Sequence, residues 1–120
     1  MMNLNSSKSG KKGEELACRF LTDKGFRILE RNYRFHKGEI DIIAKDNETL
    51  VFIEVKYRQS LEYGFPENAI TKDKIQQLRK IAGAYLFERR VDNMTCRFDV
   101  VAIIEVNKGK PTINHYFNAF

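Results

Sequence analysis

The chain has 120 residues, of which 42% are hydrophobic and 31% are charged. This length is typical of a single domain, and this composition is typical of a folded protein rather than a disordered one. No run approaches the ~18 consecutive apolar residues that span a membrane. Cys18 and Cys96 are widely separated and lack the paired spacing of a zinc site, so we expect reduced thiols in a cytoplasmic protein.

The charge balance is basic, with a net charge of +5 and a pI near 9.3. Such a balance is expected of a protein that meets the phosphates of nucleic acids, although many basic proteins bind none. Acidic side chains gathered inside a basic chain favour the nucleic-acid interpretation, because metal-dependent phosphodiester chemistry needs both signs of charge. Among the basic side chains, Arg58 and Lys74 are candidates for phosphate contacts.

In chain order, residues 1–11 are polar and basic and lack the apolar core of a secretory signal, which predicts a flexible tail before a single domain at residues 12–120. A helix is predicted over Gly13–Lys24, closed by Gly25. Glu14 lies on the flank of its apolar stripe, where it can face the core or a site. Alternatively, Glu14 is simply an acid that favours the helix dipole in the first turn.

Three strands are predicted next, each rich in β-branched and aromatic residues: Phe26–Phe35, Glu39–Ala44 and Leu50–Arg58. Residues 46–49, between the second and third strands, have the sequence Asp-Asn-Glu-Thr, which is typical of a β-turn. These two strands are therefore expected to form an antiparallel hairpin.

Two acids are expected to face each other in this hairpin. If Asp46 pairs with Thr49, counting back places Asp41 opposite Glu54, with Cβ atoms about 4.5–5.5 Å apart. Carboxylates that close repel each other unless a proton or a cation lies between them, which is the outline of a metal site. The alternative is a solvated cross-strand ion network that includes Lys56. Apolar neighbours on the same face favour the metal site: Ile43, Leu50 and Phe52.

The second half of the chain begins with a long connection, residues 59–70, which is either a loop over the site or a segment anchored to the core by its aromatic residues. A helix from the N-cap Thr71 to about Arg89 follows, with Lys74 in its first turn either reaching a cleft or extending to solvent. Phe98–Ile104 is almost continuously apolar, which predicts a buried strand with a parallel neighbour. Thr112–Phe120 is the last strand, at a sheet edge, and the order is αβββαββ.

These pieces, in this order, resemble the PD-(D/E)XK nuclease superfamily, and more closely the bacterial YraN-type family, which has relatives among archaeal Holliday-junction resolvases. The matching segments run over nearly the whole chain: Gly13–Ala17, Gly38–Ala44, Val51–Arg58, Lys74 and Arg97–Val101. One departure is Ile40, which stands where the name of the superfamily places proline, a position that supplies no reacting group. The resemblance implies an α/β (α+β), restriction-endonuclease-like fold, with a mixed central sheet flanked by helices.

The resemblance also implies roles for individual residues. Asp41 and Glu54 would bind Mg²⁺ or Mn²⁺, with the carbonyl of Val55 as a further ligand. Lys56 would be the catalytic lysine, and Glu14 the acid of the first helix beside the metal.

We therefore expect a metal-dependent endonuclease that hydrolyses phosphodiesters of DNA, with branched DNA among the candidate substrates. Two alternatives remain open. One is a non-catalytic nucleic-acid-binding module that retains a nuclease fold. The other is an interaction protein that forms a homodimer through the exposed edge of the last strand.

Overall fold

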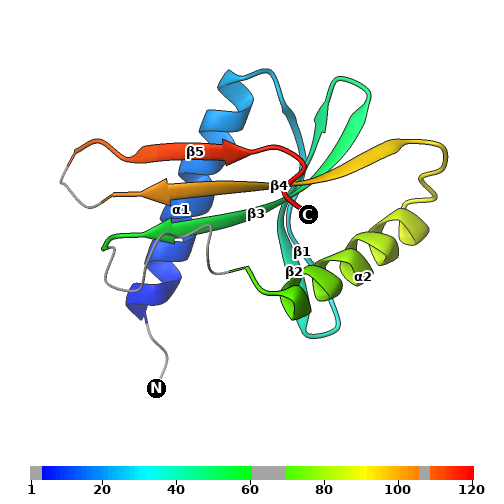
Figure 1. The fold of residues 1–120 in the computed structure, drawn as a ribbon, viewed down its shortest axis with the longest axis horizontal. Helices are drawn as coiled ribbons and strands as arrows, with labels where there is room; N and C mark the ends of the chain where they lie inside the picture. The colour runs from blue at the N-terminus through cyan, green and yellow to red at the C-terminus, as the bar shows by residue number, and fades with distance from the viewer. Residues whose placement is uncertain (1–3, 61–69, 106–108) are drawn as a thin grey trace.

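The computed structural model describes residues 4–60, 70–105 and 109–120. The elements follow in the order expected from the sequence (Figure 1): α1 (Leu4–Asp23), β1 (Arg27–Phe35), β2 (Gly38–Asp46), β3 (Thr49–Arg58), α2 (Lys72–Glu88), β4 (Thr95–Ile104) and β5 (Thr112–Tyr116). The predicted αβββαββ order is confirmed. Most of the long connection, predicted either as a loop over the site or as a segment anchored to the core, lies outside the described part of the chain, at residues 61–69.

The five strands form one mixed sheet in the order β1-β2-β3-β4-β5. Neighbouring strands are antiparallel except β3 and β4, which are parallel. The parallel pair is joined through α2, as the apolar sequence of β4 predicts for a strand buried on both faces. The coarse fold prediction, a mixed sheet flanked by helices, is confirmed.

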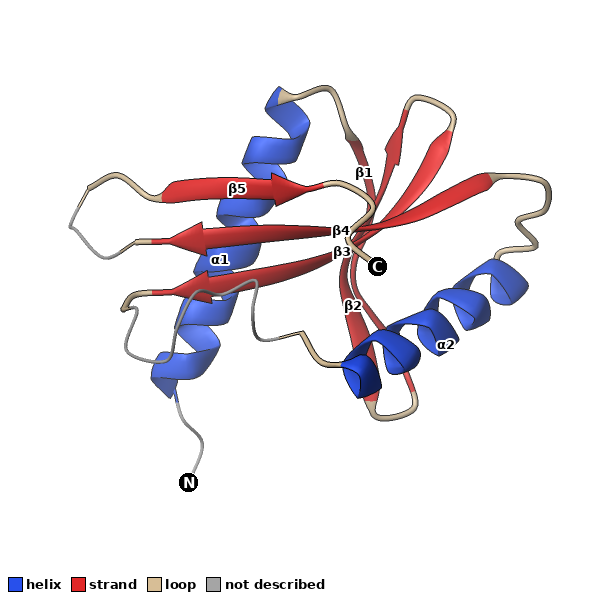
Figure 2. Ribbon diagram, viewed as in Figure 1, coloured by secondary structure: helices blue, strands red, loops and turns tan. Residues whose placement is uncertain are grey.

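The two helices cover opposite faces of the sheet, because successive strand side chains alternate between the faces. Val51 and Ile53 of β3 pack in one buried cluster with Leu21 of α1. Leu50 and Phe52 pack in another, which contains the buried face of α2. Figure 2 shows α1 crossing behind β3, β4 and β5, while α2 lies on the other side.

The first helix and the last strand differ most from their predicted bounds. The first helix begins at Leu4 rather than at Gly13, while the division into a flexible tail and a domain stays a prediction. Gly10 and Lys11 are exposed, and lysine is a good helix former on an exposed helical surface. The last strand ends at Tyr116 rather than Phe120. Asn118 takes a positive φ of 50° and donates its N–H to Asp99 Oδ1, which turns the chain out of the strand.

The pairing of β2 with β3 explains why a cleft opens in the sheet. Their register runs from Asp46↔Thr49, as the turn predicts, to Ile42↔Ile53. Asp41 lies one step beyond the last pair, where the two strands separate. In Figure 1, β1 and β2 run steeply across the view while β3, β4 and β5 run nearly horizontally. The acids expected to be paired therefore lie at the opening between the two halves of the sheet.

Candidate functional site

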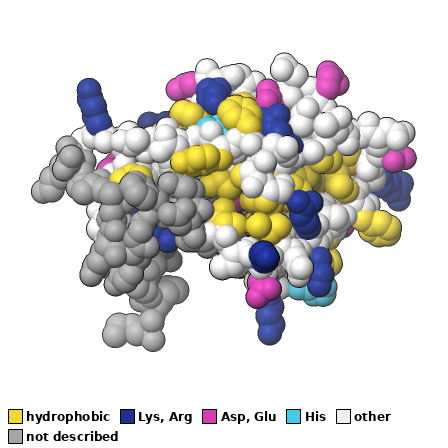
Figure 3. Space-filling view, viewed as in Figure 1, with side chains coloured by type: hydrophobic (Ala, Val, Ile, Leu, Met, Phe, Trp, Pro, Cys, Tyr) yellow, Lys and Arg dark blue, Asp and Glu magenta, His cyan; other side chains and the backbone are white. Residues whose placement is uncertain are grey.

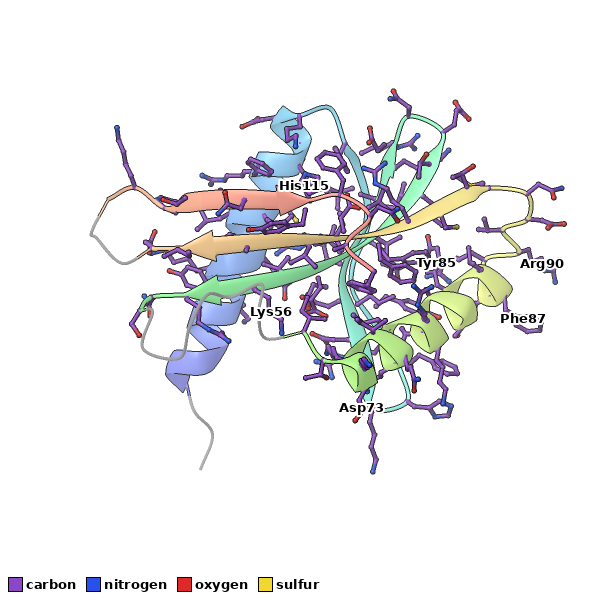
Figure 4. All side chains as sticks on the ribbon, in the orientation of Figure 1. Lys56, Asp73, Tyr85, Phe87, Arg90 and His115 are labelled. Carbon is purple, nitrogen blue, oxygen red and sulfur yellow. The ribbon has the colours of Figure 1, made fainter. Side chains whose placement is uncertain are left out.

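A cleft of about 570 Å³ occupies this opening, and α1, β2, β3 and α2 all contribute to it. Its lining includes every site residue expected from the sequence: Glu14, Asp41, Glu54, Val55, Lys56, Arg58 and Lys74. The structure thus brings these residues together, while their chemical roles stay predictions. Figure 4 shows Lys56 on β3, between α1 and the beginning of α2.

Asp41 is held against β3 by a backbone hydrogen bond. The N–H of Val55 donates to Asp41 Oδ2 at 2.8 Å. Because the β2–β3 ladder ends at Ile42↔Ile53, the carboxylate satisfies an N–H that the ladder leaves unpaired. This contact fixes the position of the carboxyl group at the mouth of the cleft.

The surroundings of Asp41 make its ionised form costly. Burial raises the pKa of Asp41, and hydrogen bonding to Glu54 and the charge of Glu54 raise it further, to about 8. The Val55 N–H and the Lys74 ammonium act in the opposite direction but are outweighed. Near neutral pH the carboxyl group therefore favours a bound proton, and a divalent cation can replace that proton.

Glu54 presents an oxygen with no hydrogen-bond donor. The residue is only 7% exposed, and its Oε2 accepts no hydrogen bond from the described residues. The Lys74 ammonium forms an ion pair with this oxygen, with Nζ 3.8 Å away. Lys74 thus reaches into the cleft, which was one of the two positions expected for it. Buried carboxylate oxygens usually have a partner, so this oxygen is available to a further donor or cation.

Three carboxylates converge beside this position. Oxygens of Glu14, Glu39 and Asp41 all lie within 4.8 Å of one another. An octahedral Mg²⁺ with ligands at about 2.0–2.1 Å spaces opposite oxygens about 4 Å apart, so small adjustments would let them share one ion. Burial and the charge of Asp41 raise the pKa of Glu14. The convergence of these acids is therefore the feature of the cleft best suited to a hard divalent cation.

Glu39 is the member of this group to which the sequence analysis gave no role. The signal was present, because side chains two residues apart in a strand point to the same face. Glu39 precedes Asp41 by two positions in β2. Only the approach of Glu14 from α1 turns this shared face into a cluster.

Basic side chains balance these acids through loose contacts. Arg31 Nη2 lies 3.7 Å from Glu14 Oε1, and Arg34 Nη2 lies 3.3 Å from Glu39 Oε2. Together with the Lys74–Glu54 pair, these contacts give Glu14, Glu39 and Glu54 each a neighbouring cation. Such long or exposed ion pairs stabilise weakly. The charge balance of the cleft can therefore change at little cost.

A second charged cluster is centred on Asp99 in the middle of β4, and its groups bond to one another. Burial alone would raise the pKa of Asp99, but hydrogen bonds from His115, Arg97 and the Asn118 N–H outweigh it and hold that pKa below its ordinary value. Lys24 Nζ lies 2.9 Å from His115 Nδ1. Because an ammonium only donates, His115 Nε2 carries the proton directed at Asp99 Oδ2. This network, near His115 in Figure 4, fixes the C-terminal segment.

An apolar cavity of about 550 Å³ lies on the face between the start of α2 and the C-terminal residues, lined by Ile70, Ile75, Val100, His115, Tyr116, Phe117, Ala119 and Phe120. Figure 3 shows hydrophobic side chains gathered in the middle of this face. Strand β5 forms the adjacent edge of the sheet. None of the described residues that line the cavity is acidic, and homodimer formation through the β5 edge stays a prediction.

The fold and the cleft define an α+β protein whose carboxylates converge where the sheet opens. A family model described as "Uncharacterised protein family UPF0102" matches residues 13–103. The chain belongs to this family, which confirms the YraN-type resemblance. Neither helix that the structure describes has the length and apolarity needed to cross a bilayer.

Relatives in this family align over most of their length. A UPF0102 protein of Trichlorobacter lovleyi is 46% identical over 112 residues, which are 92% of this chain and 88% of the relative. A UPF0102 protein of Chlorobium phaeobacteroides is 44% identical, covering 92% of this chain and 91% of the relative. A UPF0102 protein of Syntrophus aciditrophicus is 50% identical, covering 80% and 76%. Their names state a family and no activity.

Proposed function

We propose that this protein is a metal-dependent nuclease of the PD-(D/E)XK superfamily that hydrolyses phosphodiesters of nucleic acid, with DNA as the first candidate. The observation that carries this proposal is the convergence of Glu14, Glu39 and Asp41 oxygens within 4.8 Å. The element order and the mixed sheet are compatible with a restriction-endonuclease-like arrangement, which is part of the proposal.

The donor set fits Mg²⁺ or Mn²⁺, because all the candidate ligands are oxygens. Asp41 and Glu54 would hold the cation with Glu14, Glu39 and the carbonyl of Val55 as further candidates. The Glu54 oxygen without a hydrogen-bond donor and the raised pKa of Asp41 both support a cation in this cleft. When bound, such an ion polarises a phosphate and lowers the pKa of its water.

Basic side chains of the same cleft would complete the site. The Lys56 ammonium lines the cleft beside the acids, where it can donate to a water or neutralise charge on the phosphate during bond cleavage. Arg58 and Lys74 line it as well and would hold the phosphate backbone. Binding and charge stabilisation thus have separate candidate residues in one cleft.

A non-catalytic binding module is the second candidate. The observation that favours it is the presence of basic neighbours for the acids: Arg31 for Glu14 and Arg34 for Glu39. A cleft balanced in this way needs no cation for stability. In this case nucleic acid would bind to the basic surface without being cleaved.

The deciding experiment is a cleavage assay on linear, single-stranded and branched DNA, and on RNA, with Mg²⁺, Mn²⁺ or EDTA. Wild type should cleave only with the cation, and Asp41→Ala and Lys56→Ala should abolish cleavage. The matched control is Glu48→Ala, an exposed acid of the β2–β3 turn, which should cleave as wild type does. Cleavage that persists in both Asp41→Ala and Lys56→Ala would place the activity elsewhere or in a contaminant.

A further inference from the structure

Two arginines of β1 border the cluster of Glu14, Glu39 and Asp41 without lining the cleft that contains Arg58 and Lys74. Arg34 is the cross-strand partner of Glu39, and Arg31 approaches Glu14. Both arginines line a neighbouring cavity of about 490 Å³, whose walls include the same Glu14 and Glu39. Glu14 and Glu39 therefore line two cavities, each of which also has basic side chains in its walls.

The contact between Arg34 and Glu39 is loose. The Arg34 side chain is 79% exposed, and its Nη2 lies 3.3 Å from Glu39 Oε2. That oxygen nevertheless accepts no hydrogen bond from the residues that the structure describes. Arg31 is held more firmly, because it also donates to Glu15 Oε2 at 3.2 Å. Arg34 is thus the arginine whose partner is most easily replaced.

A cation is the natural competitor for Glu39. Independently of the acidic cluster, Glu54 directs a buried oxygen without a hydrogen-bond donor into the same cleft, and the residue is only 7% exposed. A divalent ion drawn there would also attract the oxygens of Glu39 and Glu14. Carboxylates that ligate an ion lose most of their attraction for a neighbouring guanidinium.

We propose that Arg34, assisted by Arg31, is a phosphate-contact site that becomes available when a divalent cation occupies the acidic cluster. The identity of the ligand, a nucleic-acid backbone, rests on the proposed function. Once Glu39 turns to the cation, the planar guanidinium can donate two N–H groups to one phosphate. Cation binding and nucleic-acid binding then strengthen each other by the same factor.

The test measures binding of a labelled DNA oligonucleotide by fluorescence anisotropy, in Ca²⁺ and in EDTA. Arg34→Gln should weaken binding about fivefold in Ca²⁺, the size of one exposed ion pair, and leave it unchanged in EDTA. In Ca²⁺, but not in EDTA, the slope of log affinity against log salt should be smaller in magnitude by about 1 for Arg34→Gln than for wild type. The control is Arg27→Gln, on the same exposed strand but outside both cavities, whose effect should not depend on Ca²⁺.

A second experiment tests the release of Arg34 without a cation. Glu39→Gln releases Arg34 without any metal, so adding Arg34→Gln to that variant should weaken binding in EDTA. An Arg34→Gln effect that is equal in Ca²⁺ and EDTA, or absent from both, would overturn the inference, as would a wild type that binds no DNA. Coupling without cleavage would refute the nuclease proposal and support this one. Cleavage by wild type together with an Arg34→Gln effect on binding that does not depend on Ca²⁺ would support the nuclease proposal and refute this inference.

Discussion

Replacing Asp41 by Asn should change how stability depends on pH. The ordinary pKa of this carboxyl group is 3.8, and its surroundings raise it to about 8. Between these values the folded state keeps a proton that the unfolded chain releases, so the free energy of unfolding falls as pH rises. Well above pH 8 the Asp41 carboxyl group is ionised in both the folded and the unfolded state, so the free energy of unfolding no longer falls through this group.

The magnitude follows from the size of the shift. One proton bound only by the folded state changes the free energy of unfolding by about 1.4 kcal/mol per pH unit, or up to about 2.7 kcal/mol between pH 5 and pH 7. Asn cannot ionise, yet it resembles the protonated acid and keeps an oxygen for the Val55 N–H. Wild type and Asp41→Asn should therefore be similar near pH 5, and the variant should be more stable by roughly 2 kcal/mol near pH 7.

The assay is urea unfolding in EDTA at several pH values for both proteins. Groups that titrate alike in both proteins contribute equally to the two free energies of unfolding, so the difference between the proteins reports the titration of Asp41. A cation at about ten times its dissociation constant should then stabilise wild type by about 1.4 kcal/mol and leave Asp41→Asn nearly unchanged. A stability difference between the two proteins that does not vary with pH would refute the reasoning about burial and Glu54.

Two further predictions concern packing and the buried network. Gly13→Ala should destabilise the fold by about 1–3 kcal/mol, because an added Cβ would lie 2.7 Å from Tyr57 Cβ. In Gly10→Ala the added Cβ meets nothing within 4 Å, so this variant should instead stabilise α1 by up to about 1 kcal/mol. Thermal unfolding of Gly13→Ala and Gly10→Ala therefore distinguishes the packing effect from the effect of helix propensity. Asp99→Ala should cost about 3–5 kcal/mol, because Arg97 loses its buried partner. Chemical unfolding measures this loss, and a cost below about 1 kcal/mol would mean that the network is dispensable.

The sequence by itself determined the order of the elements and the register of the hairpin. Both depend on interactions between residues close in the chain. Alternating apolar side chains define β2 and β3, and the turn at residues 46–49 sets their pairing, so Asp41 and Glu54 were expected near each other. The continuous apolar run of β4 likewise indicated its parallel neighbour.

Only the tertiary structure decided how the cleft is completed. The backbone ladder ends at Ile42↔Ile53, so the Asp41 carboxylate accepts the Val55 N–H and meets Glu54 through side chains rather than as a ladder pair. Glu39 belongs to an acidic cluster because the middle of α1 brings Glu14 close to Glu39 and Asp41 of β2. Such contacts join residues far apart in the chain and depend on how a helix packs on a twisted sheet. Local periodicity carries no information about that packing, which is why the pattern gave the strands but not the whole cluster.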